Sequence, residues 1–159
     1  MAEQHSSSDF TELLAAGRPA GPPMIGALLR VPLEQVQRRM LERLHEHGFD
    51  DLDTAHLPVF QYPGPQGARP SELAARLRMS KQALNYLLGT LERLGYLERQ
   101  PHPDDQRSRR IHLTARGVAT IPVIRGAVAE VEEEWTARLG RERFDALRRA
   151  LAELNAEAS

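Results

Sequence analysis

The sequence predicts a mainly α-helical chain with one small β-hairpin. Three observations support this fold class. Apolar residues recur at steps of three and four along most of the chain, two short extended segments flank a charged loop near residue 105, and glycine or proline stands where the periodicity breaks. With 159 residues, of which 41% are apolar, the chain is long enough for one compact domain with arms that could pair with a second copy.

The composition excludes several classes of protein. The sequence contains no cysteine, which rules out disulfides, thiolate metal sites and cysteine-based redox sensing. Its longest apolar runs are only a few residues, too short to cross a bilayer. The first eight residues lack the basic start and apolar stretch of a secretory signal. We therefore expect a cytoplasmic protein that has no membrane partner.

The N-terminal part is predicted to be an arm followed by a long helix. Residues 1–23 are rich in serine, glycine and proline, which favours a flexible arm. Between Leu29 and Leu44 apolar side chains recur at helical spacing, with charged side chains between them. Gly48 stands where a C-terminal glycine cap is preferred. An amphipathic helix over residues 24–48 follows.

A short helix and a loop come next. Asp53 offers an N-cap for a helix that includes Val59 and Phe60. Pro58 removes one backbone hydrogen bond within it, so the helix is expected to be short or bent. Residues 62–69 are rich in proline and glycine and are expected to form a loop.

The next two helices have well-marked ends. Pro70 opens the first, because a proline at the first helical position lacks only an N–H that has no partner there. Ser80 is placed to cap the second, over residues 81–94, and Gly95 to end it. Tyr96 can then fold back on Leu91, the apolar contact that accompanies a glycine cap.

The hairpin follows this pair of helices. Residues 96–100 and 110–113 have the pattern of strands, and they flank a polar loop of nine residues, 101–109. We expect a long hairpin rather than a tight one, because this loop is charged and contains proline.

Two more helices complete the chain. Thr114 is placed to cap a long helix that reaches Leu139 and has an apolar stripe beginning at Val118. Gly140 breaks this helix, and a final amphipathic helix follows up to about residue 155.

Two short helices, a tight break and a charged hairpin together form a winged helix-turn-helix. In the second helix, leucines between Leu84 and Leu94 form the core stripe. The opposite face carries Lys81, Gln82, Asn85, Tyr86 and Gly89. Amide side chains pair with adenine edges, an ammonium group binds guanine or phosphate, and glycine permits close approach. This face is a candidate for reading the major groove, and an ordinary solvated helix face is the alternative.

The hairpin tip carries a second candidate site. Arg107, Arg109 and Arg110 lie at or beside the tip. Asp105, two residues before Arg107, can hold that guanidinium extended by a bidentate bond, so that Arg107 can enter a narrow minor groove. The alternative is a solvated loop with a local ion pair. Both candidate sites occur in the order and spacing that a DNA-binding wing requires.

The net charge of −1 conceals a strong asymmetry. Residues 69–116 carry ten basic and five acidic side chains, a net +5, whereas the rest of the chain carries 11 basic and 17 acidic ones, a net −6. A basic lobe on an acidic frame is typical of a phosphate-binding protein.

Residues 69–117 resemble the MarR family of transcriptional regulators. The resemblance rests on PSELAARL at 70–77, MSKQAL at 79–84 and LERLGYLER at 91–99. The segment PDDQRSRRIHLTARG at 103–117 adds that family's wing pattern, Asp-x-Arg followed by apolar-x-Leu-Thr-x-x-Gly. The wing pattern is distinctive, whereas the pair of helices is shared with many winged-helix proteins. The flanking helices agree with the family only in kind.

The resemblance implies a homodimer that binds double-stranded DNA and regulates transcription, most often as a repressor. Interlocked terminal helices would place two recognition helices in successive major grooves, on a pseudo-palindromic operator with half-sites about 10 bp apart. It implies that Gln82, Asn85 and Tyr86 read bases, Arg107 enters the minor groove and Asp105 supports it. The chain then divides into an arm (1–23), an N-terminal dimerisation helix (24–48), a winged helix-turn-helix lobe (52–114) and C-terminal dimerisation helices (115–155).

Family members often bind small aromatic or phenolic molecules between the dimer helices and the DNA-binding lobe. By this resemblance Met40, Leu44, His47 and Phe60 are candidate lining residues for an effector. Ordinary packing in the core and the dimer interface is the alternative for each of them.

Two other functions compete with this interpretation. An enzyme is disfavoured, because the sequence has no His-Glu-x-x-His pair, no Gly-x-Ser-x-Gly turn and no phosphate loop, and no cofactor is expected. His45 and His47 precede three aspartates, but residues two apart on a helix face different directions, which argues against zinc. A winged helix used for protein–protein contact, with its arginines meeting an acidic partner, is the other alternative.

Overall fold

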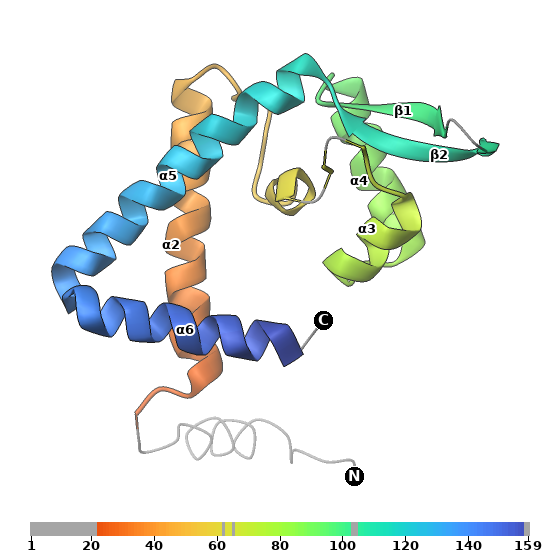
Figure 1. The fold of residues 1–159 in the computed structure, drawn as a ribbon. Coiled ribbons are helices and arrows are strands. Elements are labelled where there is room, and N and C mark those ends of the chain that lie inside the picture. Colours follow the sequence, from red (N-terminus) through yellow and green to blue (C-terminus); the bar gives the residue numbers. More distant parts are fainter. Residues whose placement is uncertain (1–21, 62, 65, 103–104, 158–159) are drawn as a thin grey trace, which may run out of the picture. The chain divides into compact units, whose positions relative to one another are not determined.

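The structure is a computed structural model that describes residues 22–61, 63–64, 66–102 and 105–157 (Figure 1). The side chains of residues 102, 105–108 and 157 are outside this described part. The predicted arm, residues 1–23, lies outside the described residues apart from its last two positions. The chain divides into two compact units, residues 1–32 and 33–159.

The described residues form six helical segments and one antiparallel hairpin, which confirms the predicted fold class. In chain order they are α2 (Ile25–Glu46), η1 (Leu57–Gln61), α3 (Pro70–Leu77), α4 (Lys81–Arg93), β1 (Leu97–His102), β2 (Asp105–Leu113), α5 (Ala115–Leu139) and α6 (Arg141–Glu157). Within the described residues, no helix is both long enough and apolar enough to cross a membrane.

The predicted long N-terminal helix is confirmed as α2. Pro32 lies inside α2, at the boundary between the two units. Gly48 ends the helix with a φ of +83°, and the Phe49 amide donates to the Leu44 carbonyl at 2.9 Å. Glycine suits this left-handed conformation because it has no Cβ to collide with the neighbouring carbonyl.

The short segment after α2 is a 3₁₀ helix, η1, rather than an α-helix. The Asp53 carboxylate accepts a hydrogen bond from the Ala55 amide at 2.8 Å, and this bond orders the turn that precedes η1. Pro58 lies inside η1, and a five-residue 3₁₀ helix loses little to the missing N–H. The expected shortness of this helix is confirmed.

The helix-turn-helix has the ends that the sequence predicts. Pro70 begins α3, and Ser80 caps α4 by accepting the Ala83 amide at 3.1 Å. Between them Arg78 adopts the left-handed conformation, with φ of 51°, and this residue makes the tight break. Gly95 ends α4, and the Tyr96 amide donates to the Leu91 carbonyl at 2.9 Å.

The core of residues 33–159 sits between these helices and the base of the hairpin. Its fully buried large side chains are Leu44, Val59, Leu73, Leu84, Leu88, Leu91, Tyr96, Ile111 and Val131. Each buried leucine or valine contributes roughly 1.5–3 kcal/mol relative to an exposed one. Leu44 from α2, Leu73 from α3 and Leu88 from α4 belong to one cluster, so α4 is anchored to the rest of this unit.

The prediction of a nine-residue loop at 101–109 was wrong. Strand pairing continues outward from Leu97↔Leu113 to Pro101↔Arg109, with a register shift before His102↔Asp105. The outer part of a hairpin can pair through its backbones while its side chains face water. It therefore lacks the apolar alternation that would have identified these residues as strand.

The loop at 62–69 also joins the sheet. Ala68 and Ile111 exchange backbone hydrogen bonds of 3.0 and 2.8 Å, which form an isolated bridge on the free side of β2. Gly67 precedes it with a φ of +68°, and a Cβ there would lie 2.6 Å from the His112 ring and 2.8 Å from the Ile111 carbonyl oxygen. Glycine is therefore required where this loop crosses the strand.

The apolar stripe of α5 differs from the prediction at its start. Val118 is 55% exposed, and the buried residues of α5 are Gly117, Thr120, Ala127 and Val131. Gly117 faces inward because the start of α5 passes close to the Tyr96 peptide. In α6, Phe144 is buried and lies edge-on to Trp135, with ring centroids 6.5 Å apart.

Candidate nucleic-acid interface

The face of α4 opposite the core is polar and accessible. Lys81, Gln82 and Asn85 are exposed, and Tyr86 is 77% exposed although it is aromatic. A Cβ at Gly89 would meet nothing within 4 Å, so the surface is open at this position. An exposed tyrosine between amide side chains can both stack and form hydrogen bonds, as contacts to base edges require.

The wing brings its arginines into two different environments. Arg109 is exposed on β2, opposite Pro101. Arg110 is half-buried, and its Nη1 donates to the carbonyl oxygens of Gln66 and Gly67, both at 3.2 Å. Arg110 therefore ties the loop to β2. The side chains of Asp105 and Arg107 lie outside the described part of the structure, so their predicted pairing stays a prediction.

A polar junction connects the end of α4 with the start of α5. The buried Tyr96 hydroxyl donates to Asp51 Oδ1 at 2.5 Å, and Arg116 Nη2 donates to Asp51 Oδ2 at 2.9 Å. The Arg116 guanidinium lies 4.3 Å from the Tyr96 ring centroid, and its Nη1 donates to the Leu94 carbonyl at 2.5 Å. Burial and the hydrogen bond to Asp51 raise the pKa of Tyr96 well above its ordinary value.

Backbone contacts reinforce this junction. The Thr114 hydroxyl donates to the Gly95 carbonyl at 2.5 Å, and the Thr114 amide donates to the Tyr96 carbonyl at 3.0 Å. A Cβ at Gly117 would overlap the Tyr96 carbonyl oxygen, so α5 packs directly on that peptide. Sequence reasoning identified Thr114 as a cap and Tyr96 as part of a helix end, but missed that they meet.

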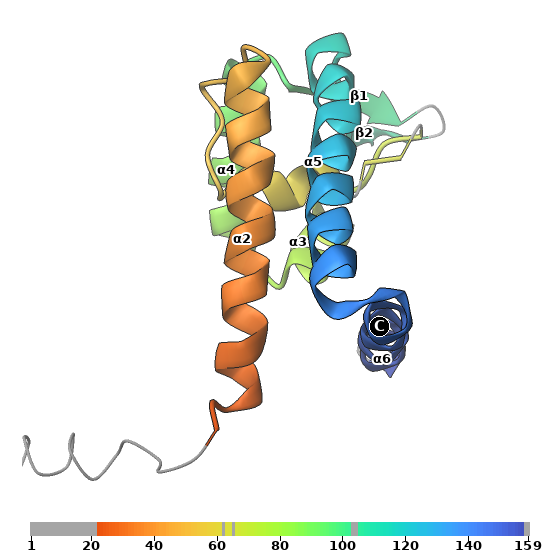
Figure 2. The same ribbon diagram turned by 90° about the vertical axis from the view of Figure 1, so that its left-hand side faces the viewer.

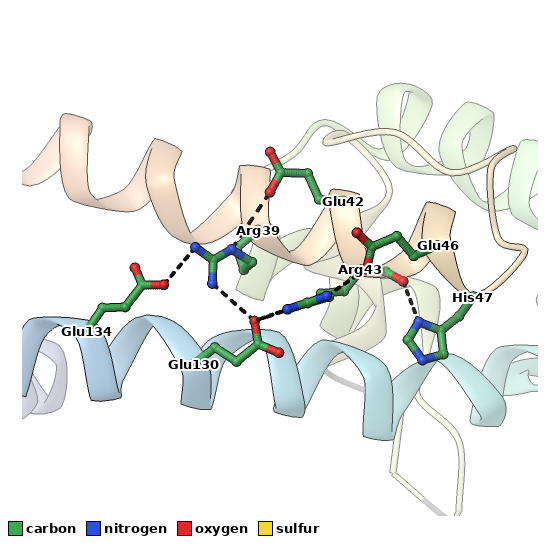
Figure 3. A network of polar contacts seen from close by, with 7 residues as sticks. All are labelled: Arg39, Glu42, Arg43, Glu46, His47, Glu130 and Glu134. Carbon is green, nitrogen blue, oxygen red and sulfur yellow. Dashed lines mark hydrogen bonds and ion pairs between the residues drawn. The ribbon is translucent and has the colours of Figure 1, made fainter.

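An ion-pair cluster joins the second half of α2 to α5, which lie side by side (Figures 2 and 3). Glu130 Oε2 accepts from Arg43 Nη2 at 2.9 Å, Arg43 Nε at 3.0 Å and Arg39 Nη1 at 3.1 Å. Arg39 Nη2 also reaches Glu134 at 2.8 Å. The hydrogen bonds from Arg43 and Arg39 lower the pKa of Glu130, and those to Glu130 and Glu46 raise the pKa of Arg43. The sequence pattern gave no indication of this cluster, because its partners are about 90 residues apart.

A cavity of about 460 Å³ lies between α2, η1 and α5. Its walls include Met40, Leu57, Phe60, Leu113, Ile121 and Arg125. Two of the four predicted lining residues, Met40 and Phe60, are therefore found there. Leu44 is instead fully buried in the core, and His47 is exposed, with its Nδ1 2.7 Å from the Arg43 carbonyl. Neither lines this cavity.

The histidines that suggested a metal make separate contacts. His45 Nε2 lies 2.9 Å from the Leu52 carbonyl, while His47 bonds within α2. Among the described residues, no three histidine or acidic side chains are grouped closely enough to hold a metal ion.

The sequence comparisons find similarity to known proteins in the part of the chain that contains the lobe. Residues 51–108 match the sequence model of the MarR family. The chain is 32% identical over 84 residues to YkoM of Bacillus subtilis, an uncharacterised HTH-type transcriptional regulator, and the match spans about half the length of each protein, 53%.

Solved structures have a similar fold over most of the chain. Wild-type apo MarR from E. coli has a TM-score of 0.66 and 24% identity, and covers 84% of this chain and 98% of its own. The complex of S. aureus MepR with DNA has a TM-score of 0.67 and 18% identity, and covers 86% of this chain and 99% of its own. At these identities the similarity establishes the fold.

Proposed function

We propose that this chain is a MarR-type regulator, that is, a sequence-specific, double-stranded DNA-binding transcriptional regulator, because residues 51–108 match that family's sequence model and the fold is similar to that of solved MarR structures. The observation that carries the proposal is the exposed face of α4. Its amides and Tyr86 point away from a leucine core, and capping fixes the helix ends that present them. MarR-family proteins are transcriptional regulators rather than enzymes. We propose that it acts in the cytoplasm.

In this proposal α4 enters the major groove and the wing reaches the adjacent minor groove. The base-reading residues are Lys81, Gln82, Asn85 and Tyr86. Arg107, held extended by Asp105, enters the minor groove, and exposed Arg109 binds phosphate. Arg110 acts differently from the other wing arginines, because it positions β2 through its bonds to Gln66 and Gly67.

We also propose that the chain acts as a homodimer on pseudo-palindromic operators. In the unit of residues 1–32, Met24, Ile25, Leu28, Leu29 and Val31 are exposed apolar residues, and Leu147 and Leu154 are exposed on α6 in the other unit. Water-exposed apolar faces of this extent are typical of surfaces that a second copy covers. Residues 24–48 and 115–155 are the proposed dimerisation helices, and residues 52–114 are the DNA-binding lobe.

We propose that the regulator is a repressor released by a small aromatic or phenolic effector. The supporting observation is the cavity beside η1, which has mostly apolar walls and a single cation, Arg125, among its lining residues. Arg125 favours an effector that carries a carboxylate or phenolate next to its ring. Mobility assays with a panel of aromatic acids test this. No change in DNA affinity with any acid, at saturating concentrations, would contradict it.

Selection of bound duplexes from random DNA tests the central proposal. Asn85→Ala is expected to cost about 1–3 kcal/mol at one base position and to relax preference there. Arg107→Ala is expected to weaken binding strongly while leaving the thermal midpoint unchanged, because a hairpin tip contributes little to the core. Equal weakening of all sequences by Asn85→Ala would make Asn85 a phosphate contact.

A protein–protein interaction module is the alternative function, since the wing arginines could also meet an acidic partner. Salt titration separates the two. A DNA-binding protein loses affinity steeply as salt rises, because binding releases counterions from the phosphates. Failure of the wild-type chain to bind any duplex at low salt would favour the module.

A further inference from the structure

We infer that the junction of Asp51, Tyr96 and Arg116 sets the half-site spacing that the protein accepts, by fixing the direction of α4 relative to α5. This inference rests on the proposed function, since it requires a dimer that presents two recognition helices to DNA. The three residues neither belong to the base-reading face nor line the cavity. They act on DNA through α4 and are therefore positioning residues.

The side-chain contacts of the junction connect three elements. Asp51 comes from the segment between α2 and η1, Tyr96 follows α4, and Arg116 lies in the first turn of α5. Each Asp51 oxygen accepts one hydrogen bond, from Tyr96 at 2.5 Å and from Arg116 at 2.9 Å. Arg116 also covers the Tyr96 ring and binds the last turn of α4 through the Leu94 carbonyl. Rotation of α4 relative to α5 would break several of these contacts together.

Backbone contacts also restrict the movement of α4 relative to α5 at this junction. Thr114 bonds to the carbonyls of both Gly95 and Tyr96, and Gly117 allows no gap between α5 and the Tyr96 peptide. The ion pairs between α2 and α5 are different, because they are partly exposed and connect long side chains. Among the polar contacts of the described residues, those that connect the end of α4 with a proposed dimerisation helix involve Thr114 and Arg116 at the start of α5.

A fixed α4–α5 angle determines where the two recognition helices of a dimer lie. Successive base pairs of DNA lie about 3.4 Å apart along the helix axis. A small tilt of α4 in both protomers therefore changes the distance between the two recognition helices by an amount comparable with one base pair. A loosened junction lets each lobe adapt, and the dimer then tolerates operators whose half-sites are closer together or farther apart.

Arg116→Met tests the inference, because methionine keeps an apolar stem but loses the bonds to Asp51 and Leu94. Arg99→Met is a matched control. Arg99 pairs with Glu92 at 3.2 Å, with similar exposure of both partners, but joins α4 to β1 within the lobe and does not reach α5. Affinity is measured for the duplex that the wild-type protein selects from random DNA, and for derivatives with one base pair added or removed between the half-sites.

The quantity that decides is the ratio of affinities for the selected and the altered spacings. We expect Arg116→Met to reduce this ratio by about two- to tenfold, and Arg99→Met to leave it unchanged. Loss of stability alone lowers affinity for all spacings equally and does not change the ratio. An unchanged ratio in Arg116→Met overturns the inference, whereas failure of the wild-type protein to select any duplex refutes the proposed function itself.

A measurement without DNA gives a second readout. The chain has no cysteine, so Ala83→Cys on the exposed side of α4 provides one spin-label site per protomer. Electron–electron distance measurements should show a broader α4–α4 distribution with Arg116→Met than with Arg99→Met. Tyr96→Phe replaces Arg116→Met if the latter does not fold, and should broaden the distribution less. Equal widths in wild-type protein and the folded junction variant overturn the inference.

Discussion

Alanine substitutions at two glycines of α5 are predicted to have opposite effects on the stability of the protein. A Cβ at Gly126 would meet no atom within 4 Å, whereas a Cβ at Gly117 would overlap the Tyr96 carbonyl oxygen and lie 3.2 Å from Leu113 Cδ2. Alanine is favoured over glycine within a helix by about 1 kcal/mol. Gly126→Ala is therefore expected to stabilise the protein by about that amount.

At Gly117 the gain in helix propensity is outweighed by the steric overlap of the added methyl group with the Tyr96 carbonyl oxygen. Inserting a methyl group into a packed site costs about 1–3 kcal/mol, and here the neighbour is a peptide oxygen that cannot rotate away. Taking the upper end and subtracting the helix gain, Gly117→Ala is expected to destabilise by about 2 kcal/mol. For a chain of this length, 1 kcal/mol corresponds to about 2–4 °C, so the melting temperature should fall by about 4–8 °C.

Thermal denaturation followed by far-ultraviolet circular dichroism measures both effects. Wild-type and variant proteins are compared at one protomer concentration, because the stability of a dimer depends on it. Gly126→Ala controls for the helix propensity of alanine in the same helix. A Gly117→Ala protein that melts at or above the temperature of Gly126→Ala would refute the close packing of α5 on the α4–β1 turn.

Three further predictions follow from the same geometry. Gly89→Ala fills open space on α4, so the free energy of unfolding of the free protein should rise by up to about 1 kcal/mol in a denaturation assay. Its affinity for the selected duplex should fall, and an unchanged affinity would contradict close approach of α4 to DNA. The depressed pKa of Glu130 stabilises the fold above the ordinary value of 4.5 and this stability is lost as pH falls, so Glu130→Gln should show a smaller acid loss than wild type in urea denaturation at stepped pH. The raised pKa of Tyr96 means that stability is full below its ordinary value of 10.0 and declines above it; Tyr96→Phe should abolish that alkaline decline, and an identical decline in both proteins would argue against burial of the hydroxyl.

The local parts of the fold were predictable from the sequence. The caps at Ser80 and Thr114 and the glycine at 95 depend on residues within three or four positions of one another, and the structure confirms each of them. The candidate base-reading face was predictable for the same reason, since helical periodicity alone separates the leucines of α4 from its polar side.

Contacts between distant residues were not predictable. Tyr96 and Asp51 are 45 positions apart, and Arg116 and Asp51 are 65 apart, so no local period connects them. Val118 satisfied the spacing of the α5 stripe, yet the buried residues at the start of that helix are Gly117 and Thr120, and Gly117 packs directly on the Tyr96 peptide. Arg110 looked like its neighbours in a basic run, and only the returning loop at 66–67 distinguishes it.

The ion pairs between α2 and α5 affect how any salt titration of this protein is interpreted. Added salt screens Arg39, Arg43 and Glu130 as well as the DNA phosphates, since these side chains are partly exposed. The slope of log affinity against log salt therefore combines counterions released from DNA with a change in the protein itself. The number of phosphates contacted should be taken from the difference in slope between wild-type protein and a wing variant, in which the contribution of α2 and α5 cancels.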